Sequence, residues 1–404
     1  MGGDAVLIAA QSGRALAQAA RRAGLRPFVA DLFGDADTLD LAEAHRPLAG
    51  RFGAGRPFGP GVLARLDELA ALAGGRAVGV VLGSGFEGAP DLIRDIADRH
   101  RLLGAAPDCI AALKDPFRFA ALCADLAIPH PSVTRAPLDD PKAWLLKRAG
   151  GCGGGHIRAA ARGPAPAGAY FQARVPGRAH ALNVLADGRT IRVLAVTEQW
   201  SAPARGRPFR YAGALARGRH EPAPIPSAII SAVTAAVDAL VRRTGLRGLA
   251  SADILVGDGA WWLTEINPRP GATLDILDRR ARPLLDAHVA ACRGDLAGLD
   301  AAPQDAAASE ICYAARDQRP VPAIDWPDHV RDRPRAGTTV ARDAPLCTVV
   351  ATGRDAGTAK QELRTRIAHL RGSLSGEEAR EHHHESQAAQ YQRPVRAPGG
   401  AADR

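Results

Sequence analysis

The chain has 404 residues, a formal net charge of +9 at pH 7 and 4% aromatic residues. Its basic residues are almost all arginines spread along the whole length, without runs of Lys and Arg interleaved with aromatic residues, so we expect no nucleic acid as a partner. We also expect no membrane partner and a cytoplasmic location, because we see neither an apolar run of about 18 residues nor the pattern of a signal peptide.

Cysteine and lysine are the two residue types whose distribution is informative. The 6 cysteines are scattered without a C-x-x-C pair, which favours reduced thiols over a disulfide framework or a structural zinc site. Lysine is found at only a few positions, namely Lys114, Lys142, Lys147 and Lys360. In a chain that uses arginine for nearly every other cation, a retained lysine indicates that its compact ammonium group matters.

The N-terminal part predicts a Rossmann-like layer. Apolar strands are expected at 5–10, 27–31 and 77–82, with a helical pattern after the first of them. The G-x-G-x-x-G fingerprint is missing, so we do not expect dinucleotide binding. Gly13 and Gly85 follow strand ends, where ligands lie in such sheets, although glycine there also serves as a turn residue.

A glycine-rich loop at residues 150–155 follows the strand expected at 144–147. Such a loop either connects two strands passively or folds its amide groups over phosphate groups. Lys147 stands at its base, where an ammonium group can serve as a point charge for a phosphate oxygen. The spacing is not that of a Walker A loop, so the loop alone leaves both interpretations open.

The segment 261–271 places polar side chains where packing alone would not. In an extended strand Glu265, Asn267 and Arg269 leave one face. A Gly-Asp-Gly turn connects this strand to the preceding one, which carries Asp253, so the two carboxylates can face the same metal ion. Acid, amide and guanidinium groups together suit a hard cation and an anionic ligand. A surface strand with a charged edge is the alternative interpretation.

The remaining elements follow from hydrophobic periodicity and turn residues. We expect helices at 108–126, 225–244, 282–293 and 358–370, strands at 170–175, 181–185, 191–197, 249–256, 310–315, 338–340 and 346–351, a loop at 202–219 and a linker at 296–309.

The order of these features resembles the ATP-grasp superfamily, including its pre-ATP-grasp layer, over residues 5–295. The motif Glu265-Ile266-Asn267-Pro268-Arg269, with Asp253 twelve positions before Glu265, is the specific part of the resemblance. The segment 178–188 is similar to the matching stretch of biotin carboxylase. The C-terminal part is similar to the closing β domain of that enzyme and to predicted carboligases of methylotrophs and methanogens, which are often associated with folate-like one-carbon cofactors.

The resemblance implies a fold class that combines α/β and α+β parts. We expect a Rossmann-like pre-ATP-grasp domain at 1–107, a two-part ATP-grasp domain at 108–295 with subdomains at 108–170 and 171–295, a small β-rich C-terminal domain at 296–371, and a disordered tail at 372–404.

The resemblance also implies roles for individual residues. The ATP-binding residues would be Lys114, Lys147, Gly151, Gly153, Gly154, Gly155, Gln172 and Val175. Asp253, Glu265 and Asn267 would hold one or two Mg²⁺ ions, with Mn²⁺ as an alternative. Lys147 and Arg269 would be the catalytic residues, and Arg269 would steady the acyl phosphate or the incoming carboxylate. The family often has an acidic ribose ligand near residues 173–180, where this chain has Ala173 and His180.

These roles predict an ATP- and Mg²⁺-dependent ligase that activates a small or cofactor-like acid as an acyl phosphate for attack by an amine, with one-carbon cofactor biosynthesis as one setting. The expected partners are small-molecule acid and amine substrates, and a homodimer is one option for the assembly. A carboxylating enzyme similar to biotin carboxylase is the first alternative. A non-catalytic nucleotide-binding protein is the second, supported only by Ala173 and His180.

Overall fold

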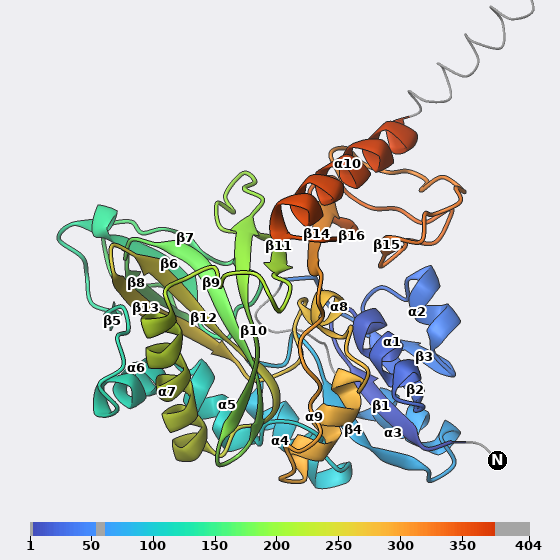
Figure 1. Cartoon of the computed structure of the whole chain (residues 1–404), viewed down its shortest axis with the longest axis horizontal. Helices are drawn as coiled ribbons and strands as arrows, with labels where there is room; N and C mark the ends of the chain where they lie inside the picture. The colour runs from blue at the N-terminus through green and yellow to red at the C-terminus, as the bar shows by residue number, and fades with distance from the viewer. Residues whose placement is uncertain (1–2, 54–60, 376–404) are drawn as a thin grey trace, which may run out of the picture. The chain divides into compact units, whose positions relative to one another are not determined.

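The structure is a computed structural model that describes residues 3–53 and 61–375. The tail predicted at 372–404 lies outside the described residues from position 376 onward. The chain divides into two units, Met1–Leu363 and Arg364–Arg404, and every contact discussed below lies within the first. The described strands of this unit form three sheets (Figure 1).

The N-terminal part folds into a parallel four-stranded sheet with the order β3-β2-β1-β4. Its strands are β1 (Ala5–Ala9), β2 (Arg26–Asp31), β3 (Ala44–Pro47) and β4 (Ala77–Leu82), and its helices are α1 (Arg14–Arg22), α2 (Ala36–Leu41), α3 (Val62–Leu72) and α4 (Pro90–Arg99). The predicted Rossmann-like layer is confirmed, with one strand more than expected. β3 escaped prediction because its sequence Ala-His-Arg-Pro has no apolar run.

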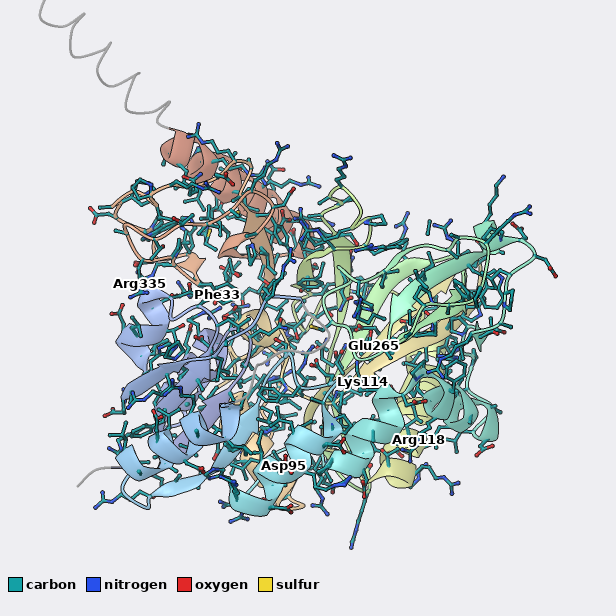
Figure 2. The ribbon with its side chains drawn as sticks, turned by 180° about the vertical axis from the view of Figure 1, so that it is seen from behind. Phe33, Asp95, Lys114, Arg118, Glu265 and Arg335 are labelled. Atoms are coloured by element: carbon teal, nitrogen blue, oxygen red, sulfur yellow. The ribbon has the colours of Figure 1, made fainter. Side chains whose placement is uncertain are left out.

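Two short helices and a small antiparallel sheet follow. The helices are α5 (Pro107–Lys114) and α6 (Pro116–Asp125), and the sheet has the order β5 (Val133–Thr134), β8 (Ala169–Ala173), β6 (Trp144–Arg148), β7 (Arg158–Ala159), with a 3₁₀ turn at Pro141–Ala143. The single helix predicted at 108–126 is wrong. Asp115 separates the two helices and caps the second, because its side chain accepts hydrogen bonds from Phe117 N at 3.0 Å and Arg118 N at 2.9 Å. Lys114 is therefore the last residue of α5 (Figure 2).

The largest sheet has eight strands in the order β13-β12-β9-β10-β11-β14-β16-β15. Its strands are β9 (Arg178–Asp187), β10 (Ile191–Ser201), β11 (Tyr211–Ala216), β12 (Arg247–Gly257), β13 (Ala260–Asn267), β14 (Ala306–Tyr313), β15 (Val330–Arg331) and β16 (Pro345–Gly353). The helices in this part of the chain are α7 (Ser227–Thr244), α8 (Leu274–Leu277), α9 (Leu284–Cys292) and α10 (Ala356–Ser375).

Three predictions for this region are wrong. β11 lies inside the predicted loop 202–219, and β14 begins inside the predicted linker 296–309. Both strands consist mainly of small residues, which give a weak sequence signal but pair well in the middle of a sheet. The strand predicted at 338–340 is only an isolated bridge between Gln318 and Val340.

The C-terminal strands continue the sheet instead of forming a separate one. β14 pairs with β11 in antiparallel register, with Glu310 opposite Gly213 and Ala307 opposite Ala216. The combination of a parallel sheet with antiparallel sheets confirms the expected mixed fold class. The division into domains at 107, 295 and 371 stays a prediction.

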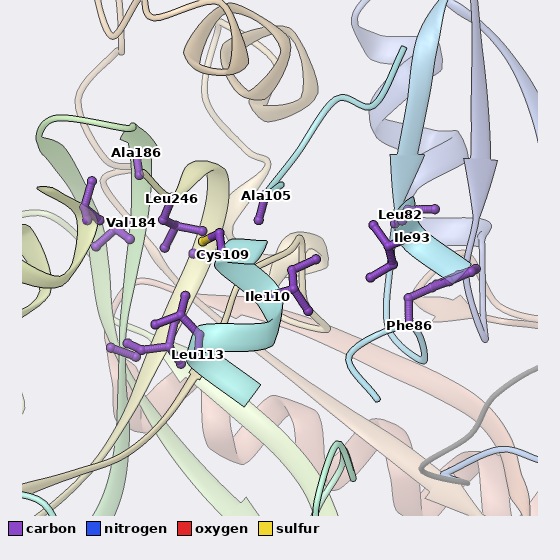
Figure 3. Packing of buried hydrophobic residues seen from close by; sticks show 14 of the residues in the cluster. Leu82, Phe86, Ile93, Ala105, Cys109, Ile110, Leu113, Val184, Ala186 and Leu246 are labelled. Atoms are coloured by element: carbon purple, nitrogen blue, oxygen red, sulfur yellow. The ribbon is translucent and has the colours of Figure 1, made fainter. Parts of the chain in front are cut away.

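Helix α5 is packed into the core from both sides (Figure 3). Its buried residues Cys109, Ile110 and Leu113 belong to one hydrophobic cluster that includes Phe86 near β4 and Val184 on β9. The helix also contacts α4, α7 and β13. Because these contacts fix the helix, they also fix the position of Lys114 at its end.

One buried arginine links three distant segments. Arg14 begins α1 and is 1% exposed. Its Nη2 donates to Asp275 Oδ2 at 2.6 Å and its Nε to Asp332 Oδ1 at 3.1 Å, so α1 is tied to α8 and to the segment after β15. Burial lowers the pKa of Arg14, but the two carboxylates outweigh it and hold that pKa above its usual range.

We predict that Arg14→Met lowers the free energy of unfolding by about 3–5 kcal/mol, because it leaves the largely buried carboxylates of Asp275 and Asp332 without their cation. Arg354→Met is the matched control, since Arg354 also pairs with an aspartate but is 88% exposed, and we expect no measurable change. Urea unfolding followed by circular dichroism measures both. Equal stability of the two variants would contradict the role of Arg14.

Candidate functional site

The β12–β13 hairpin brings the three predicted metal ligands together. Its antiparallel register, which shifts between Asp253 and Ile254, places Asp253 opposite Glu265 and Ser251 opposite Asn267. The two carboxylates thus lie on adjacent strands as predicted, and their role as metal ligands stays a prediction. Asn267 Nδ2 donates to Asp253 Oδ2 at 3.0 Å. The amide therefore presents its oxygen, Oδ1, on the other side, where it remains able to accept.

The ammonium group of Lys114 lies against this set. Its Nζ donates to Glu265 Oε1, and to Ile266 O and Asn267 Oδ1 at 3.3 Å each. The Lys114 side chain is only 5% exposed. Figure 2 shows Lys114 and Glu265 side by side. A carboxylate, a carbonyl and an amide oxygen thus converge on one small cation.

Burial and neighbouring charges set the ionisation of this cluster. Burial raises the pKa of Glu265, but Lys114 and Lys147 outweigh it and lower that pKa to about 2. Burial and the charge of Glu265 raise the pKa of Asp253. Two carboxylates this close repel each other when both are ionised, so the site gains from a nearby cation.

A cavity beside the hairpin collects several predicted ATP-binding residues. With the open solvent at its mouth included, it measures about 390 Å³. It is lined by Lys114, Lys147, Gly151, Gln172 and Glu265, together with Leu113, Pro116, Phe119, His130, Val133, Arg148, Gly150, His156, Tyr170 and Thr264. Lys147 is 5% exposed, and its Nζ donates to Gln172 Oε1 at 3.0 Å. Burial lowers the pKa of this ammonium group, with Lys114 acting in the same direction.

Not every predicted residue reaches this cavity. Val175 is half-buried between β8 and β9 and does not contribute to the lining found among the described residues. The same holds for Gly153, Gly154 and Gly155. Their places in an ATP site stay predictions.

Two histidines in the cavity wall escaped prediction. Burial and the charge of Lys147 lower the pKa of His130 to about 4. Burial, assisted by Lys147 and Lys114, also lowers the pKa of His156 to about 4. Both rings are therefore neutral at pH 7 and can contribute apolar surface or a single N–H donor. The position of His156 directly after the glycine-rich loop was the available sequence signal.

The glycine-rich loop is docked against the start of β11. Tyr211 N donates to Gly153 O at 2.9 Å. Gly154 has φ +68°, and a Cβ atom there would lie 1.9 Å from Phe209 O. Only glycine fits this position, because both the backbone conformation and the space exclude a side chain.

Arg269, predicted as an anion clamp, already has a partner. Its Nε donates to Glu87 Oε1 at 2.5 Å, and its Nη1 donates to Pro270 O at 3.1 Å. Glu87 is 4% exposed and also accepts from Gly85 N at 2.6 Å. Burial raises the pKa of Glu87, but Arg269 and Lys114 outweigh it and lower that pKa. The sequence pointed to this region only through Gly85, which follows a strand end where ligands lie, and did not identify this ion pair.

Cys152 lies within the loop as a protonated thiol. It is 7% exposed, and burial, with the charge of Glu87 acting in the same direction, raises its pKa to about 12. A thiol with such a pKa is a poor nucleophile at pH 7. Cys152 therefore serves as a small buried residue of the loop.

We compared the chain with models of known protein families. The family model described as an ATP-grasp domain matches residues 117–273. Residues 117–273 thus form an ATP-grasp domain. The matched span includes Lys147, the glycine-rich loop and the β12–β13 hairpin, whereas Lys114 lies just before it.

Solved structures show the same fold over most of the chain. The biotin carboxylase domain of a single-chain bacterial carboxylase has a TM-score of 0.63 and 20% identity, over 88% of this chain and 87% of that one. Phosphoribosylglycinamide synthetase from Anaerococcus prevotii has a TM-score of 0.63 and 12% identity, over 91% and 98%. L-amino acid ligase from Bacillus licheniformis has a TM-score of 0.61 and 14% identity, over 91% and 97%. The comparison with curated protein sequences gives no match.

Two further observations concern only the residues that the structure describes. None of their helices is both long and apolar enough to cross a membrane. They also contain no group of three or more His, Cys, Asp or Glu side chains placed to hold a metal ion. The ATP-grasp hairpin offers two carboxylates and one amide, which is a different donor set.

We predict that Gly154→Ala releases the loop from β11, because the added methyl group would collide with Phe209 O. Gly155→Ala is the matched control, since the nearest atom to its Cβ, Arg207 Cδ, is 3.8 Å away. Hydrogen exchange of the Tyr211 amide reports the docking. We expect exchange to accelerate on the order of tenfold in Gly154→Ala only. Equal protection in both variants would contradict the observed docking.

Proposed function

We propose that the protein is an ATP- and Mg²⁺-dependent ligase that activates a carboxylate as an acyl phosphate for attack by an amine, forming ADP. The observation that carries this proposal is the arrangement of Lys114, Lys147 and Glu265 around one cavity beside the glycine-rich loop, with Asn267 Oδ1 accepting from Lys114 Nζ. The match to an ATP-grasp domain supports ATP as the nucleotide. The fold shared with phosphoribosylglycinamide synthetase and L-amino acid ligase supports a ligase reaction.

The donor set fits Mg²⁺. Glu265 Oε1 and Asn267 Oδ1 both accept from the Lys114 ammonium group, so these oxygens already surround a positive charge. Carboxylate and amide oxygens are hard donors of the kind that Mg²⁺ prefers, and Mn²⁺ accepts the same ligands. Asp253 would complete the set through the hairpin register. When bound, Mg²⁺ would neutralise charge on the phosphate oxygens.

The protein side chains would supply positioning and charge. Lys114 and Lys147 would bind the phosphates of ATP, and the docked loop would exclude water from them. Arg269 is oriented by Glu87 through its Nε, which leaves Nη2 for the acid or its acyl phosphate. During transfer, charge spreads over the phosphoryl oxygens, and these preorganised cations would stabilise it. The amine would then displace phosphate without any enzyme nucleophile.

A carboxylating reaction with bicarbonate is the second candidate. It is supported by the fold shared with biotin carboxylase domains over 88% of the chain. The two candidates differ in what they require, because carboxylation needs bicarbonate and no amine. A single assay can therefore separate them.

We predict that ADP release depends on both an acid and an amine. A panel of small and folate-like acids combined with amines, with bicarbonate as a separate arm, tests this by coupled ADP detection. Hydroxylamine should trap the activated acid as an acyl hydroxamate. ADP release that needs bicarbonate but no amine would favour the carboxylating enzyme. Nucleotide binding without ADP release on any acid would reject both.

We predict that Glu265→Gln lowers ADP release by about 100-fold or more, because it removes a charged ligand beside the phosphates. Glu68→Gln is the matched control, since Glu68 is also ion-paired but lies on α3 at the surface. Its rate should equal that of the unmodified protein. Full turnover by Glu265→Gln would contradict the assigned metal ligand.

A further inference from the structure

A buried donor just after β1 has no acceptor among the residues that the structure describes. Gln11 is 1% exposed, and its Oε1 accepts from Gly53 N at 3.2 Å and from Cys152 Sγ at 3.9 Å. These two donors fix the orientation of the amide, so the other end is the nitrogen. Within the described part of the chain, Gln11 Nε2 is buried without any hydrogen-bond acceptor. Buried amide donors nearly always have a partner, so this one requires an explanation.

The unpaired nitrogen lies next to the Arg269 ion pair. A Cβ atom on Gly85 would be 3.1 Å from Gln11 Nε2, so the amide packs directly against Gly85. The backbone N of Gly85 donates to Glu87, which in turn accepts from Arg269. Gln11 therefore lies near the carboxyl ends of β1 and β4. Gly85 and Glu87 connect it to Arg269, the predicted anion clamp.

The glycine-rich loop connects this position to the rest of the site. Cys152 lies 3.9 Å from Gln11 Oε1, and the charges of Glu87, Arg269 and Lys114 all act on its thiol. Lys147 pairs with Gln172 on the small antiparallel sheet, whereas Gln11 follows β1 of the N-terminal parallel sheet. A ligand that satisfies Gln11 would lie between the phosphate-binding lysines and the N-terminal sheet.

The chemistry of these groups selects an anionic oxygen ligand. Gln11 Nε2 can only donate, and so can the remaining N–H groups of Arg269. A carboxylate offers two oxygens that can accept from both. We propose that Gln11 Nε2 donates to the substrate carboxylate that becomes phosphorylated, and that the acid binds at the carboxyl ends of β1 and β4. This inference rests on the proposed ligase function and adds the place and a specificity residue for its acid.

Two variants of Gln11 test the donor. Gln11→Glu keeps the shape and the oxygen that faces Gly53 but replaces the donor with a negatively charged oxygen. Gln11→Met removes the donor without adding charge, so the test remains valid even if the Gln11→Glu variant does not fold. Gln304→Glu is the control for the charge change, because Gln304 is exposed on the surface.

The experiment measures binding of ¹³C-formate to the full chain in the presence of Mg²⁺ and ADP, by line broadening in nuclear magnetic resonance. Formate is the smallest carboxylate, so it fits wherever the carboxylate of a larger acid lies. We expect broadening with the unmodified protein and with Gln304→Glu, and binding weaker by about tenfold or more in both Gln11 variants. ADP affinity should stay the same in all four proteins.

Three results would overturn the inference. Formate could bind the Gln11 variants as well as the unmodified protein, or fail to bind the unmodified protein. ADP affinity could fall together with formate binding, which would assign Gln11 to a phosphate oxygen instead. Because formate binding needs no turnover, its loss in the variants would support the acid subsite even if no acid and amine pair released ADP.

Discussion

The site depends on one constraint, the antiparallel register of β12 and β13. That register places Asp253 beside Glu265 and points Asn267 into the same cluster. Two neighbouring ionised carboxylates repel each other unless a cation is present, and here Lys114 supplies it. A one-residue slip would send Glu265 and Asn267 to the opposite face of the sheet. The hydrophobic residues Leu263 and Ile266, both fully buried, oppose such a slip.

The lysine itself is positioned by packing. Helix α5 ends at Lys114 because Asp115 leaves the helical conformation and caps α6, where Pro116 takes the first position. The buried face of α5 packs in the same hydrophobic cluster as residues of the N-terminal sheet and of β9. The core therefore sets the distance between the ammonium group and the hairpin. Arg14 adds a second link among the N-terminal sheet, α8 and the segment after β15.

The sequence predicted the parts of this site that depend on local pattern. Strand alternation and a Gly-Asp-Gly turn were enough to place Asp253 and Glu265 on adjacent strands, but the register shift between Asp253 and Ile254 that sets them directly opposite each other had no such signal. The rarity of lysine drew attention to four positions, and two of these lysines, Lys114 and Lys147, line the cavity. Contacts between distant segments carried no such signal. The Glu87–Arg269 ion pair joins residues 182 positions apart, and the unpaired nitrogen of Gln11 is visible only in three dimensions. β11 was missed because Ala and Gly have weak strand propensity, and its pairing with β10 and β14 decides its structure.

The most direct test of the account is a crystal structure of the protein with Mg²⁺ and ADP. We predict the metal ion between Glu265 and Asn267, the phosphates in contact with Lys114 and Lys147, and the loop at 150–155 closed beside them. A nucleotide bound elsewhere, or bound with its metal ion away from Glu265, would contradict it.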